Sequence, residues 1–413
     1  MFIVAAASSF IVIAALLIQL IWVRRFLQLY KPRSIVQFDQ ASAPKIAIIL
    51  CVRGVDPSLE SCLRGIFTQK YSNYDVKIML DHPDDPARPL IERVIVELGA
   101  NHASIHVVAN RLGTCALKLN ALVEAIESLD DSYRAVALID ADVQAYPEWL
   151  QDLTAPLSEP GVGGVNGVRW FVPMANNPGT LIRYLWNAGA VTQMAAFGIP
   201  WAGSLVLSRD AIRRSGLLEI WRHALCDDVS IVQAFAPLSL RMVPIGRVTM
   251  TCRETVSWLG CFQFVTRQLL VARLHHPRWR SILAFGVLVS LALLASLTLA
   301  VVAILTRSWN VAIVSLSTLI VDFVGLSIGL WAIERYIQSL QVARGQPGWR
   351  VPWQAFACLP FAQIFHLAAL IAASCMPRVT WRGITYEIRG PSDVRVVEYR
   401  PFSPTTGDDA SLI

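Results

Sequence analysis

The chain has 413 residues, of which 54% are apolar and 16% charged, with a formal net charge of +6. It is too apolar for an ordinary soluble enzyme, yet the segment between about residues 24 and 280 holds most of the charges and is long enough to bury a full core. The Arg and Lys residues cluster beside apolar segments, so they indicate the flanks of membrane spans rather than a nucleic-acid partner. The eight cysteines form no CxxC pair, which argues for reduced thiols and against zinc or a disulfide framework.

An apolar run at residues 2–23 has the length needed to span a bilayer. No basic residue precedes it, whereas Arg24 and Arg25 follow it directly. A cleaved signal peptide has its charges on the opposite side. We therefore expect an uncleaved anchor with the N-terminus outside and the following segment in the cytoplasm; the alternative is a buried core helix.

From Lys45 onward, apolar β-prone runs alternate with helical patterns. Strands are expected at 45–51, 75–80 and 105–109, with helices between them and an amphipathic helix from Thr114 to Ser128. Short links between repeated β-α-β units predict an α/β fold with a doubly wound, mainly parallel sheet. A further strand is expected at 200–207.

One strand, at 135–139, ends in two carboxylates, Asp140 and Asp142. Because an unpaired buried charge is costly, such residues are expected at the carboxyl end of a strand, where ligands bind in open α/β sheets. Two oxygen ligands there suit a hard divalent cation held between the protein and a diphosphate. The pair therefore predicts a metal–nucleotide site in a transferase.

The sequence pattern of the C-terminal part predicts that it associates with a membrane. Residues 262–280 mix basic and apolar residues at helical spacing, as in a helix that lies in the membrane interface. Two spans are expected at about 282–305 and 309–332. A third apolar stretch, 353–376, is interrupted by Pro360 and reads as either a span or a kinked membrane segment. The basic tail after it favours the cytoplasm, which requires that 353–376 does not cross fully.

Five motifs, in this order, resemble those of the ceramide glucosyltransferase-like members of the family-2-type glycosyltransferases. They are the segments Arg53 to Pro57, Asp81 to Ala87, Asp140 to Asp142, Cys226 to Asp228 and Trp381 to Gly383. The resemblance covers about residues 1–390 and implies a GT-A fold with N-terminal and C-terminal transmembrane helices. The implied domains are an anchor at 1–23, a cytoplasmic catalytic domain at 40–260, an interfacial helix at 261–281, a membrane region at 282–377 and a basic tail at 378–413.

The resemblance also implies roles for individual residues. Asp85 matches the family's first aspartate, which contacts the uridine part of the donor, and its neighbours Asp81 and Asp84 assist. Asp140 matches the second aspartate, and with Asp142 it would bind Mg²⁺ or Mn²⁺. Asp228 matches the third, the general base for the acceptor hydroxyl. Further candidates are Lys118 for the donor phosphate, Asp227, Arg267, Gln268, Arg273, Trp381 and Arg382. Several of these candidates have an alternative explanation. The acids beside proline could merely form turns, and Lys118 could be an exposed residue of its helix. Trp381 and Arg382 could anchor the chain at the membrane interface.

The chain departs from the family in one place. The family pattern has Arg or Gln, two variable residues and then Arg-Trp, whereas Arg267, Gln268 and Leu269 are followed here by Leu270 and Val271. That pair is associated with donor phosphate and acceptor positioning. Its absence would alter the choice of donor, the choice of acceptor or the activity itself, unless Arg273 or Arg382 takes over its role.

The prediction from the sequence is an integral membrane, inverting hexosyltransferase that moves a hexose, glucose by resemblance, from a UDP-sugar to a lipid hydroxyl. Ceramide, another sphingoid lipid, a hopanoid and a diacylglycerol all remain open as acceptors. One alternative is a processive polysaccharide synthase, which would need more spans and the intact Arg-Trp pair. The other is a catalytically weakened homologue that binds membrane lipid.

Overall fold

A computed structural model describes residues 1–31 and 40–402 and divides the chain into two compact units. Of the described residues, the sheet unit comprises 30–31, 40–170, 198–252 and 376–402, and the helical unit comprises 1–29, 171–197 and 253–375. Residues 403–413 of the predicted tail lie outside the described part.

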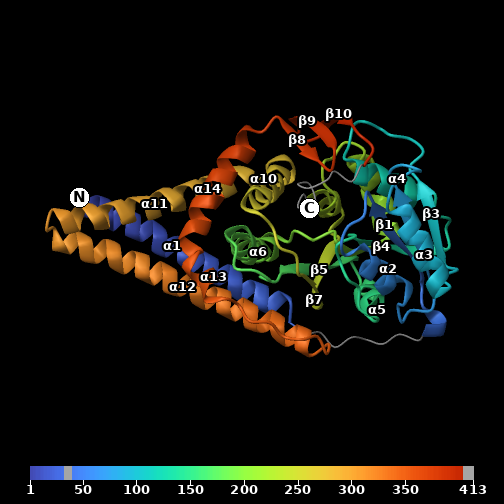
Figure 1. The fold of residues 1–413 in the computed structure, drawn as a ribbon, viewed down its shortest axis with the longest axis horizontal. Helices are drawn as coiled ribbons and strands as arrows, with labels where there is room; N and C mark the ends of the chain where they lie inside the picture. Colours follow the sequence, from blue (N-terminus) through green and yellow to red (C-terminus); the bar gives the residue numbers. More distant parts are fainter. Residues whose placement is uncertain (32–39, 403–413) are drawn as a thin grey trace. The chain divides into compact units, whose positions relative to one another are not determined.

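The sheet unit is built on a seven-stranded sheet in the order β3-β2-β1-β4-β6-β5-β7 (Figure 1). Its strands are β1 (Lys45–Val52), β2 (Tyr74–Leu80), β3 (Ala103–Val107), β4 (Tyr133–Ile139), β5 (Val162–Phe171), β6 (Ser204–Ser208) and β7 (Arg241–Cys252). β1 pairs in parallel with β2 and β4, β2 pairs in parallel with β3, and β6 runs antiparallel to β4 and β5. The predicted α/β fold with a mainly parallel sheet is confirmed.

Helices connect and cover these strands. They are α2 (Leu59–Phe67), α3 (Arg88–Leu98), α4 (Leu117–Glu127), α5 (Trp149–Thr154), α7 (Arg209–Ser215), α8 (Leu217–Trp221) and α9 (Asp228–Phe235), with short 3₁₀ turns at Gln40–Ser42, Ala155–Ser158 and Ala236–Leu238. α4 packs against β1 and β2, while α7 packs against β4 and β6. Central strands β1 and β4 are almost wholly buried, as expected for parallel strands covered on both faces.

The order of strands changes direction between β1 and β4, which are neighbours although β2 and β3 lie between them in sequence. In open α/β sheets, ligands bind at this switch point, outside the carboxyl ends of the strands. The turn after β1 begins at Arg53, and Asp140 directly follows β4. Both predicted motifs therefore lie at the position where the topology places a ligand site.

A second, three-stranded antiparallel sheet forms the end of the described chain and was not predicted. Its strands are β8 (Arg378–Trp381), β9 (Ile384–Gly390) and β10 (Asp393–Tyr399), in the order β10-β9-β8. The turn from β8 to β9 consists of Arg382 and Gly383, with φ of 45° and 77°. Positive φ at both positions is typical of a type I′ hairpin turn, so the Trp-Arg-Gly motif forms a hairpin of the sheet unit.

The helical unit contains α1 (Phe2–Leu29), α6 (Pro178–Phe197), α10 (Trp258–His275), α11 (Trp279–Leu305), α12 (Trp309–Val342), α13 (Trp353–Ala357) and α14 (Leu359–Cys375). By length and composition, α1, α11 and α12 can cross a membrane. They pack along one another (Figure 1), with small residues such as Ala5, Ala303 and Ala312 at the contact. Hydrogen bonds join Ser296 to Ser8 and Thr318 to Ser9 across these helices, as is common between helices in lipid.

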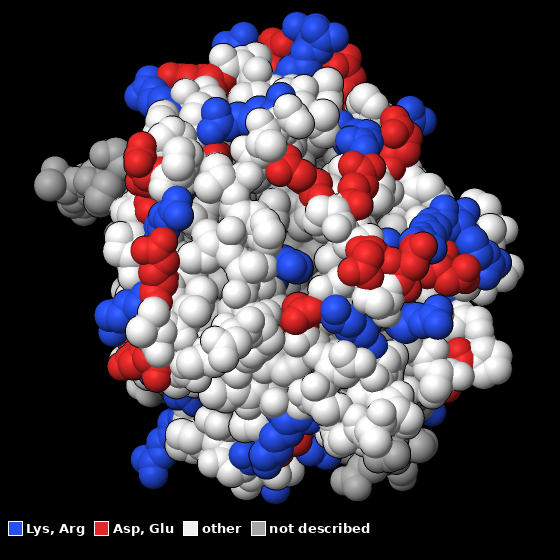
Figure 2. All heavy atoms as spheres, turned by 90° about the vertical axis from the view of Figure 1, so that its right-hand side faces the viewer, with Lys and Arg blue, Asp and Glu red and all other residues white. Residues whose placement is uncertain are grey.

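The side of the sheet unit that carries α2 and α3 shows basic and acidic residues interspersed around a broad uncharged area (Figure 2). Arg64, for example, pairs with Glu60 and Glu97. The charges on this face neutralise one another locally, so the net positive charge of the chain is not concentrated there.

Candidate active site

The centre of the candidate site is the end of β4. The backbone N–H of Asp140 donates to the carbonyl of Gly203, 3.2 Å away. A Cβ atom at Gly203 would lie only 2.5 Å from Oδ2 of Asp140 and 2.3 Å from the Trp201 ring. The backbone at 203 therefore approaches the carboxylate as closely as only glycine permits.

Lys118, on α4, joins two acidic motifs that are far apart in sequence. Its Nζ lies 2.7 Å from Oδ1 of Asp140 and 2.8 Å from Oδ2 of Asp227. Burial lowers the pKa of Lys118, but the two carboxylates outweigh it, so the pKa is raised well above its usual value. Burial likewise opposes ionisation of Asp140, yet Lys118 lowers the pKa of that carboxyl overall. Lys118 is thus a charged bridge in the site, not an exposed helix lysine.

The neighbouring Asp228 differs from Asp140. Burial first, and then the charge of Asp227, raise its pKa from 3.8 to about 6. Its Oδ1 accepts hydrogen bonds from the Cys226 thiol at 2.9 Å and from the Val229 N–H at 2.8 Å. Burial and these acids also raise the pKa of Cys226 well above its usual value, so the thiol stays protonated and donates its hydrogen to Asp228.

Asp142 pairs with Arg169, a residue on β5 that sequence reasoning missed. Burial raises the pKa of Asp142, and Arg169 opposes that rise. The same arginine lies 3.3 Å from Sγ of Cys252 and faces the Trp201 ring. The sequence does contain a signal for this residue, because Arg169 directly follows the Gly-rich apolar run of residues 161–168. Within the described residues, Oδ1 of Asp142 is buried without a hydrogen-bond partner, so the acid keeps a free acceptor.

The three acids after β2 lie in different environments. Asp85 is buried and accepts from the N–H groups of Gly54, at 3.0 Å, and Ala87, at 2.9 Å. Asp81 is also buried and forms an ion pair with Arg53. The side chain of Asp84 is 89% exposed, and its carboxylate lies 3.7 Å from Nδ1 of His82. Asp81 and Asp85 therefore belong to the ordered turn region beside the site, whereas Asp84 faces solvent.

The C-terminal sheet is bound to that same turn region. Arg382 donates to the carbonyl of Arg53 at 2.8 Å and to Asp56 at 3.0 Å, while Arg53 Nε donates back to the carbonyl of Arg382 at 2.8 Å. Tyr399 donates its hydroxyl hydrogen to Asp81, 3.1 Å away. These bonds favour the positive φ of Arg382.

The sheet also contacts the helix that carries Lys118. The N–H of Leu117 donates to the Tyr386 hydroxyl at 3.2 Å, which satisfies one N–H at the start of α4. Arg382 is in addition one of the charges that lower the pKa of Asp140, after Lys118 and Arg169. Of the two candidates in the Trp-Arg-Gly motif, Arg382 therefore contacts the turn after β1 and acts on the charge of Asp140. Trp381 is the last residue of β8.

Three further candidates belong to the helical unit. Arg267, Gln268 and Arg273 are on α10. Arg273 donates to the carbonyls of Ala373 and Ser374, at 2.7 and 2.9 Å, so it caps the end of α14. An Arg-Trp pair, which sequence reasoning overlooked, occurs later than the family pattern places it: Arg278 directly precedes α11, and Trp279 is its first residue.

The sequence pattern of glycosyl transferase family 21 matches residues 2–393 of the chain. The chain belongs to this family. The resemblance to ceramide glucosyltransferases seen in the sequence is therefore confirmed at the family level, and the protein is a glycosyltransferase with a GT-A fold and membrane-type helices.

Individual relatives are more distant. A ceramide glucosyltransferase from Candida albicans is 36% identical over 69 residues, which cover 16% of this chain and only 13% of that protein. A solved mannosyltransferase from Pyrobaculum calidifontis, in complex with GDP-Man and Mn²⁺, is similar in structure with a TM-score of 0.52, 17% identity and coverage of 90% of this chain and 98% of its own. Glucosyl-3-phosphoglycerate synthase from Mycobacterium tuberculosis, at 15% identity, covers 62% of this chain and 87% of its own with a TM-score of 0.38.

Proposed function

We propose that the protein transfers a hexose, glucose by family resemblance, from a UDP-sugar to a hydroxyl group of a membrane lipid, with inversion at the anomeric carbon. The observation that carries the proposal is the bridge made by Lys118 between Asp140 and Asp227, beside Asp228. It gathers at one strand end the charges needed to bind a diphosphate and a carboxylate suited to act as a base.

The donor would lie at the carboxyl ends of β1, β2 and β4. Asp85 and Asp81 hold the turn of Arg53 and Gly54 in place, next to the expected position of the nucleoside. Lys118 and Arg169 are cations that pair with Asp140 and Asp142, beside the expected position of the diphosphate. Both already pair with carboxylates, so a donor phosphate would share them with Asp140 and Asp142.

A divalent cation fits these residues. Asp140 and Asp142 offer hard oxygen ligands, and the buried Oδ1 of Asp142 has no hydrogen-bond partner in the described part of the chain. When bound, Mg²⁺ or Mn²⁺ would neutralise the charge that develops on the departing UDP. The mannosyltransferase relative was solved with GDP-Man and Mn²⁺, which supports a metal and a nucleotide sugar in general.

Asp228 is the proposed general base. With a pKa of about 6, it is ionised at neutral pH but basic enough to accept the proton of an acceptor hydroxyl. The acceptor oxygen forms its bond to the anomeric carbon as the bond to the UDP oxygen breaks. One such displacement inverts the centre, so an α-linked UDP-sugar would give a β-glycoside.

The proposal is tested by incubating membranes that contain the protein with labelled UDP-sugars, lipid extract and Mg²⁺ or Mn²⁺. We expect a labelled glycolipid, its loss on chelation of the metal, and a rate reduction of about 10²-fold to 10⁴-fold for Asp140→Asn and for Asp228→Asn. Asp210→Asn, at an exposed acid of α7, is the matched control and should retain full activity. Absence of labelled lipid with every donor would refute the proposal, and full activity of either site variant would refute the assigned role.

A second candidate, a catalytically weakened homologue that binds membrane lipid, is favoured by one observation. Leu270 and Val271, which stand where the family has Arg-Trp, are both buried in the helical unit. Calorimetry with UDP and Mg²⁺ distinguishes the two functions. If the homologue is inactive because it no longer binds the donor, it should show no metal-dependent heat of binding.

A further inference from the structure

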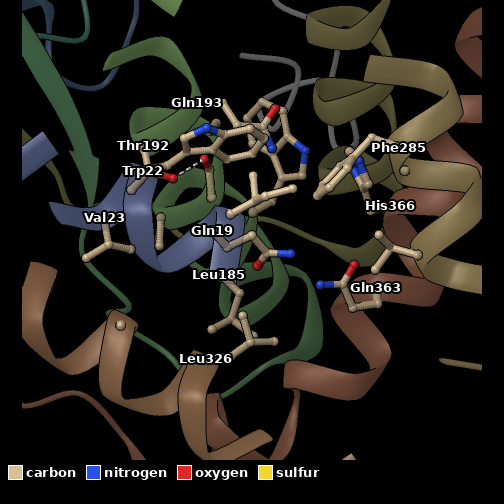
Figure 3. Close-up of a pocket in the computed structure, with 18 of the residues that line it drawn as sticks. Gln19, Trp22, Val23, Leu185, Thr192, Gln193, Phe285, Leu326, Gln363 and His366 are labelled. Carbon is tan, nitrogen blue, oxygen red and sulfur yellow. Dashed lines mark hydrogen bonds between the residues drawn. The ribbon is translucent and has the colours of Figure 1, made fainter. Parts of the chain in front are cut away.

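Each unit of the chain has a place where aromatic rings lie beside polar groups. In the helical unit it is a cavity of about 560 Å³, bounded by α1, α6, α11, α12 and α14. The rings of Trp22 and Phe197 pack there with centroids 5.7 Å apart, and the amide groups of Gln19 and Gln363 point toward each other (Figure 3). In the sheet unit it is the segment 399–402, whose rings lie among charged side chains at the turn after β1.

Phe402, three residues after β10, lies with its ring against Gly54 in that turn. A Cβ atom at Gly54 would be only 2.5 Å from Cε1 and Cζ of the ring, so the ring fills the volume that a side chain at position 54 would need. The φ of Gly54 is 74°, which also favours glycine. Residues 53–58 of the turn include no aromatic residue. The C-terminal segment therefore supplies an aromatic ring that the turn itself lacks.

Hydrogen bonds hold the chain in place just before this ring. The N–H of Arg400 donates to the carbonyl of Gly383 at 3.1 Å, and the guanidinium of Arg53 donates to the carbonyl of Arg400. The Tyr399 hydroxyl is bonded to Asp81, as described above. The C-terminal sheet and the turn after β1 therefore set the position of Phe402 together.

The ring lies next to an acid of the proposed donor site. Both carboxylate oxygens of Asp85 are 3.0 Å from the nitrogen of Gly54, so Asp85 and Phe402 contact the same residue of the turn. A carboxylate has about four lone-pair sites, and the N–H groups of Gly54 and Ala87 use only part of that capacity. The ring of Phe402 is half-buried. A ligand at this position would therefore meet an aromatic surface and a hydrogen-bond acceptor.

A flat ring with polar edges is the kind of ligand that suits this combination. Nucleobases stack on aromatic side chains, and the N–H and hydroxyl groups of a nucleoside donate hydrogen bonds to carboxylates. A diphosphate instead requires cations, and in the proposed site these are Lys118 and Arg169. The surroundings of Phe402 therefore suit the nucleoside end of a donor and not its phosphates.

We infer that the ring of Phe402 stacks on the nucleobase of the sugar donor, beside Asp85. The inference rests on the proposed function, which puts a UDP-sugar at the carboxyl ends of β1, β2 and β4. It adds that the donor site is completed by the segment that follows the last membrane helix and the C-terminal sheet. Phe402 contacts the substrate and contributes to the affinity for the donor, while the acids and cations described above perform the transfer.

Three variants isolate the contribution of the ring. Phe402→Ala removes it, and Phe402→Tyr keeps an aromatic surface at the same position. Val397→Ala shortens an exposed side chain of β10 in the same sheet and is the matched control. None of these changes removes an acid or a cation of the proposed site.

The test uses the full chain in phosphatidylcholine nanodiscs with Mg²⁺ or Mn²⁺. Calorimetry measures the affinity for UDP, which should fall about tenfold in Phe402→Ala through the loss of one stacking contact. Phe402→Tyr and Val397→Ala should bind UDP as the original protein does. In addition, 5-iodo-UDP is irradiated on the original protein, because its base forms a covalent bond with an aromatic ring stacked on it. We expect mass spectrometry to find the cross-link on the peptide that contains Phe402.

Unchanged UDP affinity in Phe402→Ala would overturn the inference, and so would an equal loss in Val397→Ala. A loss confined to Phe402→Ala without a cross-link at Phe402 would show that the ring only supports the turn, which also overturns it. Failure of the original protein to bind UDP with either metal would instead refute the proposed function. The two failures are therefore distinguished by the affinity of the original protein.

Discussion

At the scale of single residues, environment assigns different tasks to acids that look alike in the sequence. Asp140 is paired with Lys118, and its pKa is lowered. Asp228 is buried beside Asp227, and its pKa is raised to about 6. A carboxylate held ionised is suited to bind cations, whereas one with a raised pKa is suited to exchange a proton near neutral pH.

The raised pKa of Asp228 predicts an acidic limit of activity. The base works only when ionised, so the transfer rate should fall as the pH drops through about 6, by about tenfold per pH unit below it. Initial rates from pH 5 to 8 at saturating donor check this. Asp227→Asn removes the neighbouring charge, so the pH at which the rate begins to fall should be lower in this variant. An unchanged pH dependence would show that another group sets the acidic limit.

The bridging position of Lys118 predicts an effect on stability. Lys118→Met leaves Asp140 and Asp227 without their shared cation, and breaking such a buried contact costs about 3 kcal/mol. Lys45→Met, which removes a partly exposed pair with Asp75, should cost under about 1 kcal/mol. Denaturation of both variants at pH 7 measures the difference. Equal losses would mean that the Lys118 bridge is no stronger than a surface pair.

At the scale of elements, the main strands and helices were predictable, but the C-terminal sheet was not. β1, β2 and β4 are apolar runs bounded by turns, and such runs form strands wherever they are buried. Residues 378–399 contain many charges and were interpreted as a basic tail. The signal was weak but present, because Ile384, Tyr386 and Ile388 alternate with polar residues and are the buried positions of β9.

This sheet is expected to stabilise the turn after β1. Arg382→Met would leave the buried Asp56 without its ion pair, at a cost of about 3 kcal/mol, and should accelerate hydrogen exchange across β8 and β9. Arg389→Met, which breaks an exposed pair with Glu387 in the same sheet, should change stability by less than about 1 kcal/mol. Hydrogen-exchange mass spectrometry on the full chain compares them. Unchanged exchange in Arg382→Met would contradict the supporting role.

At the scale of the whole molecule, the C-terminal sheet bears on the topology in the membrane. The strands after α14 are hydrogen-bonded to the turn after β1, through Arg53 and Arg382. No bilayer can lie between groups in such contact, so both ends of the membrane region must emerge on one side. α11 and α12 are long and apolar enough for two crossings, and α14, with 17 residues, is shorter than the roughly 20 needed to span.

We therefore predict that residues 353–376 enter the membrane without crossing it. Protease sites inserted at 130–131 and at 391–392 should be cleaved from the same side of sealed vesicles, and a site in the turn at Arg307 only from the opposite side. The first two positions are exposed loops of the sheet unit. Opposite accessibility of these two sites would mean that 353–376 crosses fully. The same experiment tests the proposed cytoplasmic location of the catalytic unit.

The sequence by itself determined the fold class, the family and the candidate acids, because hydrophobic periodicity and short acidic motifs depend on residues that are close along the chain. Only the tertiary structure decided which charges meet. Lys118 with Asp227, Arg169 with Asp142 and Arg382 with Asp56 are contacts between distant segments, and no local pattern encodes a partner. The cavity beside Gln19 and Gln363 was hidden for the same reason. Its lining residues lie on separate helices, and they come together only when those helices pack.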